Sequence, residues 1–152
     1  MLITMSDPFS LVASSFAVLG AVDVVLKASV ACCHFLSQIR DAPNEIRDLR
    51  SRIEENKVLI EAFMKHFHEV QNTATSSATS TMTEALKLFE SSTNSFKREL
   101  KALERFRDKY TSKRKIWSAL KYHLDDRKVT RCVRNLENAK SGLCAALSSV
   151  ER

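Results

Sequence analysis

The residue types that most often perform chemistry are present in this chain, but they are not spaced for a shared site. The cysteines and histidines are Cys32, Cys33, Cys132, Cys144, His34, His66, His68 and His123. None of the cysteines forms a CxxC pair, and the histidines do not supply the spacing of a zinc site beside them. We therefore predict no metal site and no cofactor, and we interpret the cysteines as small, mostly buried thiols in a reducing compartment.

Catalytic sequence motifs are missing as well. Gly20 and Gly142 stand alone, so the chain has no glycine-rich phosphate loop, and it has no GxSxG or HExxH motif. The adjacent carboxylates Glu54 and Glu55 would point to different sides of a helix and could not share a substrate. The sequence predicts no catalytic residues and a protein that is not an enzyme.

The element around which the chain must be organised is the stretch Phe9–Ile39, which is almost entirely apolar. Only Asp23, Lys27 and His34 within it can carry charge. At about 1.5 Å per residue, Phe9–Leu26 is long enough to cross a thin bilayer. Because Asp23 and several serines interrupt it, we expect a helix buried in a bundle rather than a constitutive membrane span.

The boundaries of this first helix follow from local signals. Asp7 can cap the start and Pro8 suits the first helical position, so the helix should begin there and run to about Arg40. The polar side of the helix shifts near Gly20, which predicts a kink or break at that residue.

The rest of the chain alternates apolar and charged residues as amphipathic helices do. Apolar positions spaced by three and four residues predict three further helices, starting near Asn44, Met82 and Asp126. Their seams are Ile46, Leu49, Ile53, Asn56, Ile60, Phe63, Phe67 and Val70; Met82, Leu86, Phe89, Thr93, Phe96, Leu100, Leu103, Arg107 and Tyr110; and Val129, Cys132, Leu136, Ala139, Leu143, Ala146 and Val150. Asn56 is the polar exception, which either fixes the register of the helices or faces a loop.

These elements predict an all-α, antiparallel four-helix-type bundle with the hydrophobic N-terminal helix at its centre. We expect Trp117 to fill one end of the bundle. The Ser/Thr-rich tract 71–81 should form a flexible loop, because its side chains bury little and compete for backbone hydrogen bonds. Residues 1–152 form one domain, which we expect to be the N-terminal module of a longer protein.

A basic surface is the second candidate for function. The net charge is +6. Between Phe96 and Arg134 the sequence contains fourteen basic and five acidic residues, so the excess positive charge is concentrated in this segment. The candidate face for anionic lipids comprises Lys97, Arg98, Lys101, Arg105, Lys109, Lys113, Arg114 and Lys115. An ordinary solvated helix face is the alternative. Nucleic acid is not expected as a partner, because the face lacks interleaved stacking aromatics.

Four segments carry a resemblance to a known family. These are Asp7–Leu11 with the Ala/Ser/Val-rich helix after it, the turn Asp41–Ile46, the tryptophan-containing segment Ile116–Lys121, and Leu136–Leu143. In this order and spacing they resemble the fungal N-terminal domain of STAND proteins, which are NLR-like receptors. The resemblance covers nearly the whole chain and implies a helical bundle akin to HeLo-like domains.

The resemblance implies a signalling or cell-death effector domain that oligomerises and disturbs membranes through its N-terminal helix. The candidate insertion residues are Phe9, Leu11, Val12, Phe16, Val18, Leu19, Val22 and Asp23. Self-association, anionic membrane lipids and other signalling domains are the implied partners, with a cytoplasmic location and recruitment to membranes on activation. The alternative is a homotypic interaction or oligomerisation adaptor with no membrane activity.

Asp23 and Lys27 allow a residue-level prediction. They are four residues apart with the acid first, which is the favourable order for an ion pair on a helix. We expect them at the polar edge of the resting helix, paired or solvated. A charge at bilayer depth costs roughly 2.5–3.5 kcal/mol on insertion scales. Asp23 would therefore act as a brake on premature insertion.

Overall fold

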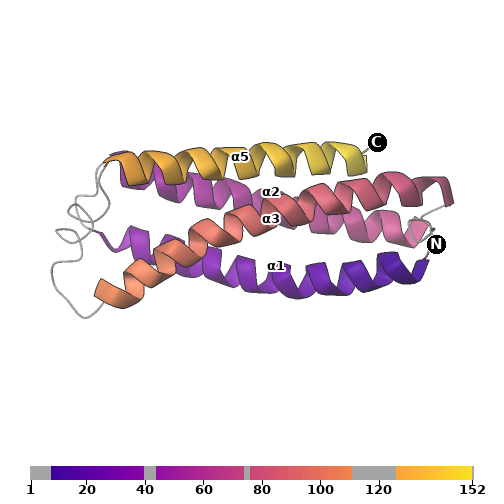
Figure 1. Ribbon diagram of the computed structural model, residues 1–152, viewed down its shortest axis with the longest axis horizontal. Coiled ribbons are helices and arrows are strands. Elements are labelled where there is room, and N and C mark those ends of the chain that lie inside the picture. Colours follow the sequence, from indigo (N-terminus) through magenta and orange to yellow (C-terminus); the bar gives the residue numbers. More distant parts are fainter. Residues whose placement is uncertain (1–7, 40–43, 74–75, 111–125, 152) are drawn as a thin grey trace.

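The computed structural model describes the backbone of residues 8–39, 44–73, 76–110 and 126–151, and the side chains of 20–39, 44–69, 82–108 and 129–150. The described chain consists of the helices α1 (Pro8–Ser37), α2 (Asn44–Thr73), α3 (Ser76–Tyr110) and α5 (Asp126–Glu151). Successive helices run in opposite directions along one long axis (Figure 1). The predicted all-α, antiparallel four-helix bundle is thus confirmed.

The packing order of the helices differs from their order in the chain. α5 lies against both α2 and α3, and α1 completes the bundle on the other side of the same two helices. The neighbours α2 and α5 therefore run parallel, as do α1 and α3, whereas α3 and α5, which pack most extensively, run antiparallel (Figure 1).

The predicted seams form the core. Every described residue of the seams on α2 and α3 is buried except Arg107, and on α5 only Cys132 is half-exposed. At the centre, the rings of Phe63 on α2 and Phe89 on α3 stack with centroids 3.9 Å apart, and Phe67 stacks on Phe63 at 6.0 Å. Spacing by three and four residues predicted these positions because it keeps one face of each helix toward its neighbours.

Asn56 faces the core and not a loop. Its side chain is fully buried, and its amide nitrogen Nδ2 donates to the carbonyl of Arg52 at 2.8 Å and to that of Leu136 on α5 at 3.2 Å. The carboxamide oxygen Oδ1 is buried with no hydrogen-bond partner. Asn56 thus joins α2 to α5 at one defined level, which is the register role that the sequence left open.

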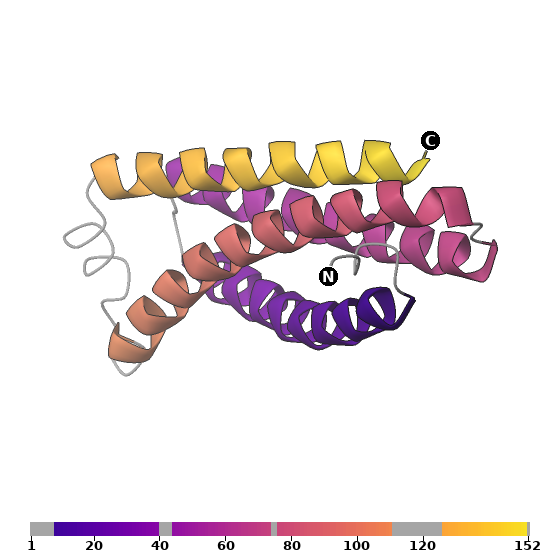
Figure 2. The ribbon, with the colours of Figure 1, turned by 45° about the vertical axis from the view of Figure 1, so that its right-hand side comes forward.

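The apolar helix α1 contributes to the core without being enclosed by it. Val22, Val25, Cys32 and Leu36 are buried on its inner side, whereas its outer side, including Val24, is open to solvent. The helix continues unbroken through Gly20, so the predicted break there is wrong, and its ribbon curves smoothly (Figure 2). α1 is more peripheral than its apolar content suggested, because the other three helices already bury their seams largely against one another.

Two further sequence predictions concern the tract 71–81 and Trp117. The tract 71–81 is helical over 71–73 in α2 and 76–81 in α3, so the predicted loop is wrong. Ala is the best helix former, and Ser and Thr cost only a few tenths of a kcal/mol each, so two long helices can extend into such a tract. The expected packing of Trp117 lies outside the described residues.

Candidate membrane-facing helix and basic surface

The described part of α1 contains a segment that meets the length and composition of a membrane span. This segment is Gly20–Ser37, with a mean hydropathy of 1.4, and 39% of it is buried in the bundle. A core helix of a soluble bundle meets the same criteria, so the contacts of α1 with its neighbours decide what the helix can do. The side chains of the sequence-predicted stretch before Gly20, from Phe9 through Leu11, Val12, Phe16 and Val18 to Leu19, lie outside the described residues.

The inner face of α1 is apolar and carries one satisfied polar group. Val22, one of the predicted insertion residues, is buried there. The Ser29 hydroxyl is fully buried and donates to the carbonyl of Val25 in its own helix at 2.8 Å. Because this hydrogen bond lies within the helix, Ser29 would keep its partner if α1 moved as a unit into another apolar medium.

The outer face of α1 carries the predicted ion pair. Lys27 Nζ lies 3.1 Å from Asp23 Oδ2, and the two side chains are 78% and 67% exposed. The expectation that they are paired at the solvated edge of the helix is confirmed. Val24 and Val30 flank the pair and are more than half exposed.

The attachment of α1 to the other helices is apolar, apart from contacts of two thiols. The Sγ of Cys32 lies 3.7 Å from the carbonyl of Leu100 on α3, and the Sγ of Cys33 lies 4.0 Å from that of Arg50 on α2. The ring of Phe35 contacts that of Phe106 on α3 with centroids 6.5 Å apart. Within the described part of α1, no ion pair reaches another helix.

Burial makes the thiols of Cys32, Cys33 and Cys132 unreactive. It raises the pKa of Cys32 and of Cys33 to about 12, and it raises the pKa of Cys132 further, with Glu99 adding to that effect. Cys32 and Cys33 diverge toward α3 and α2, as neighbouring helical residues must. All three stay protonated at neutral pH, a state with little nucleophilicity. Cys144 is exposed, unlike the mostly buried thiols expected from the sequence.

The attachment of α5 contrasts with that of α1. Between α2 and α5, Arg52 pairs with Glu137, and Lys140 Nζ lies 3.1 Å from Glu55. This hydrogen bond from Lys140 lowers the pKa of Glu55. Between α3 and α5, the amide of Asn135 donates to Glu99 at 2.6 Å. The sequence does not reveal these contacts, because charged residues at the edges of a seam look the same whether they pair across helices or face water.

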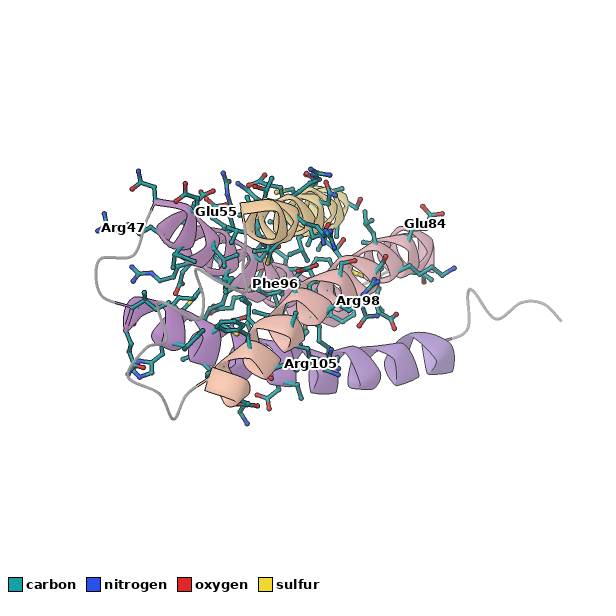
Figure 3. All side chains as sticks on the ribbon, turned by 60° about the vertical axis from the view of Figure 1, so that its left-hand side comes forward. Arg47, Glu55, Glu84, Phe96, Arg98 and Arg105 are labelled. Atoms are coloured by element: carbon teal, nitrogen blue, oxygen red, sulfur yellow. The ribbon has the colours of Figure 1, made fainter. Side chains whose placement is uncertain are left out.

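Half of the predicted basic surface is described. Arg98, Lys101 and Arg105 on α3 are exposed, and Lys97 is half-exposed beside them; Figure 3 labels Arg98 and Arg105. Among the described residues, none of these four cations has an acidic partner within 4.0 Å, whereas Arg107 on the same helix binds Asp108 at 3.2 Å. Their charges are therefore available to an anionic partner. The side chains of Lys109, Lys113, Arg114 and Lys115 lie outside the described residues.

Other kinds of site find no support among the described residues. No group of three or more His, Cys, Asp or Glu side chains could hold a metal ion there. A wide-open depression at the start of α2, lined by Asn44, Glu45, Arg47, Asp48 and Ser51, encloses too little to orient a substrate. Comparisons with protein-family models, with curated proteins and with solved structures give no match. The function has to be argued from the geometry.

Proposed function

We propose that this chain is the N-terminal signalling or cell-death effector module of a fungal NLR-like (STAND) protein, acting by oligomerisation and membrane association. The observation that carries the proposal is the attachment of α1, the most apolar helix, which no ion pair ties to its neighbours within the described residues. The resemblance in the sequence supplies the family.

Apolar contacts are the kind that a lipid bilayer can replace. Val22, Val25 and Leu36 are shielded from water in the bundle core and would also be shielded from it in hydrocarbon. Because both media are apolar, moving these side chains from one to the other costs little hydrophobic free energy. The backbone of α1 is hydrogen-bonded within the helix, as a span requires. The described groups that oppose entry are chiefly Asp23 and Lys27 on the outer face.

The basic surface on α3 supplies attraction to the membrane before any insertion. An anionic leaflet attracts nearby cations by about 1 kcal/mol each, and Arg98, Lys101 and Arg105 form no ion pair with another described residue. Such binding is electrostatic and should weaken with salt.

Departure of α1 would leave the other three helices joined by the polar contacts across α5 and by the Phe63–Phe89 stack. It would also uncover the apolar surfaces of α2 and α3 that contact α1. Exposed apolar surface favours association, which links release of α1 to oligomerisation.

The alternative function is a homotypic adaptor with no membrane activity. The exposed valines on the outer face of α1 favour it, since a protein partner would cover them in the intact bundle.

Binding to vesicles separates the two functions. We expect the wild-type chain to sediment with anionic vesicles at low salt and to release an entrapped dye. The triple variant Lys97→Glu, Lys101→Glu, Arg105→Glu should lose both. A matched control reverses three exposed cations on α2, Arg47→Glu, Arg50→Glu and Lys65→Glu, and should keep more binding. Equal loss in both triple variants would show that only total charge matters, and no binding by the wild type would favour the adaptor.

A further inference from the structure

The outer face of α1 concentrates exposed apolar side chains around one ion pair. Val24 and Val30 are 52% and 54% exposed, and they account for two of the four exposed large hydrophobic residues in the described chain. Asp23 and Lys27 lie between them on the helix surface. Gly20 lies on the same face, and nothing would meet a side chain there within 4 Å. Among the described helices, no other helix covers this face.

We infer that this face pairs with the same face of a second copy of the chain, about a twofold axis. A surface that carries one acid and one base four residues apart is complementary to itself when two copies run antiparallel. Asp23 of each copy then faces the partner's Lys27, so that two ion pairs form across the axis. A partner of one charge sign would match only half of this surface, which is why a second copy fits it best.

The register that pairs the charges also accommodates the valines. With the axis at the level of Val25, the two Val24 side chains meet beside it. Val30 lies at the level of the partner's Gly20, where the missing side chain leaves room. One register therefore satisfies the charged, apolar and small residues of the face together.

This inference rests on the proposed function for the role of the pair, but the surface of the pair differs from the one that release of α1 would uncover on α2 and α3. A contact between single helices is small, so the pair is weak and depends on protein concentration. It covers the outer face of α1, and the two copies must separate before α1 can enter a bilayer. The pair is thus a resting form of the effector.

Disulfide trapping tests the contact. Val24→Cys in a Cys144→Ser chain places two thiols beside the proposed axis. The matched control is Val58→Cys in the same background, since Val58 on α2 is equally exposed, at 59%. With diamide as oxidant, we expect the Val24→Cys chain to shift to the dimer mass and the Val58→Cys chain to stay monomeric. No shift, or the same shift in both chains, would overturn the inference.

Charge exchange tests the pairing partner. The Asp23→Lys chain carries two bases and the Lys27→Asp chain two acids, so each should dimerise about tenfold more weakly than wild type in sedimentation equilibrium. An equimolar mixture should recover the affinity as a mixed dimer. Circular dichroism checks that each variant stays folded. If the mixture is no tighter than its components, the inference is wrong.

Failure of this inference can be told from failure of the proposed function. The Asp23→Lys chain keeps a charge on α1 and the whole basic surface, so it should still bind anionic vesicles while losing the dimer. Conversely, the triple variant on α3 should lose vesicle binding and keep the dimer. That result would show that the basic surface on α3 and the outer face of α1 act independently.

Discussion

Asp23→Ala should increase membrane activity with almost no effect on folding. The Asp23–Lys27 pair is a highly exposed pair on one helix, and such pairs contribute about 0.3–0.5 kcal/mol to stability. Water screens this pair further at 67% and 78% exposure, and Ala is the better helix former. The free energy of unfolding should therefore change by less than about 0.5 kcal/mol.

The effect on insertion should be several times larger. A carboxylate at the centre of a membrane helix costs roughly 2.5–3.5 kcal/mol, and Asp23 lies near the start of the Gly20–Ser37 segment, where the cost is smaller. We take about 1–2 kcal/mol, which corresponds to a 5- to 30-fold shift of the insertion equilibrium. Lys27 remains, but its long side chain can extend toward the headgroups.

Dye release from anionic vesicles at limiting protein concentration measures this shift. Asp23→Lys retains a charge on α1 and, at a protein concentration at which the wild type is monomeric, should release dye at the wild-type level. Glu61→Ala is the matched control, because Glu61 is also an exposed acid that pairs within its own helix, with Lys57 on α2. If the wild type is active and Asp23→Ala releases no more dye than Glu61→Ala, α1 is not the inserting helix.

Three further predictions concern the bundle itself. Asn56→Leu should change the free energy of unfolding by less than about 1 kcal/mol in urea titrations, because two hydrogen bonds are lost but the unpaired Oδ1 disappears. Gly142→Ala should destabilise by about 1 kcal/mol, since its Cβ would collide with the Ser92 hydroxyl on α3 and lie 3.1 Å from Ser92 Cβ, and Ser92→Ala in the same chain should recover part of the loss because it removes the hydroxyl. Alkylation at pH 8, followed by mass spectrometry, should modify Cys144 long before Cys32, because burial holds the pKa of Cys32 at about 12.

Each of these three predictions can be contradicted by a specific result. A large loss in Asn56→Leu would mean that the hydrogen bond to Leu136 outweighs the cost of the unpaired oxygen. A Gly142→Ala chain as stable as wild type would show that rotation of the Ser92 hydroxyl or a slight separation of α3 and α5 costs no more than the gain in helix propensity from Gly to Ala. Equal alkylation of Cys32 and Cys144 would show that α1 opens readily in solution.

The fold was largely predictable because a repeated spacing of three and four residues leaves little choice about which side of a helix is buried. The seam on α2 shows this, including its one polar member, Asn56. The weak helix propensity of Ser and Thr alone does not predict the helical parts of the tract 71–81, because the long helices on either side extend into it over 71–73 and 76–81.

The candidate site was less predictable. α1 is apolar all round, so its sequence does not say which side faces the bundle, and only the structure shows that Val22 is buried and Val24 exposed. The exposure of Asp23 and Lys27 could be anticipated, since charged residues keep to water where they can. The pairing of Lys140 with Glu55 could not, because it depends on the register of α5 against α2.

The central claim, that α1 leaves the bundle for the bilayer, is tested most directly by a fluorophore on its exposed face. An environment-sensitive dye on Val24→Cys in the Cys144→Ser chain, at a protein concentration low enough to keep the chain monomeric, starts in water, with Val58→Cys on α2 as control. On addition of anionic vesicles at low salt, we expect the dye at position 24 to brighten, shift to the blue and be quenched by lipids carrying a quencher on the acyl chain. An unchanged spectrum at position 24, while the protein is bound to the vesicles, would contradict the account.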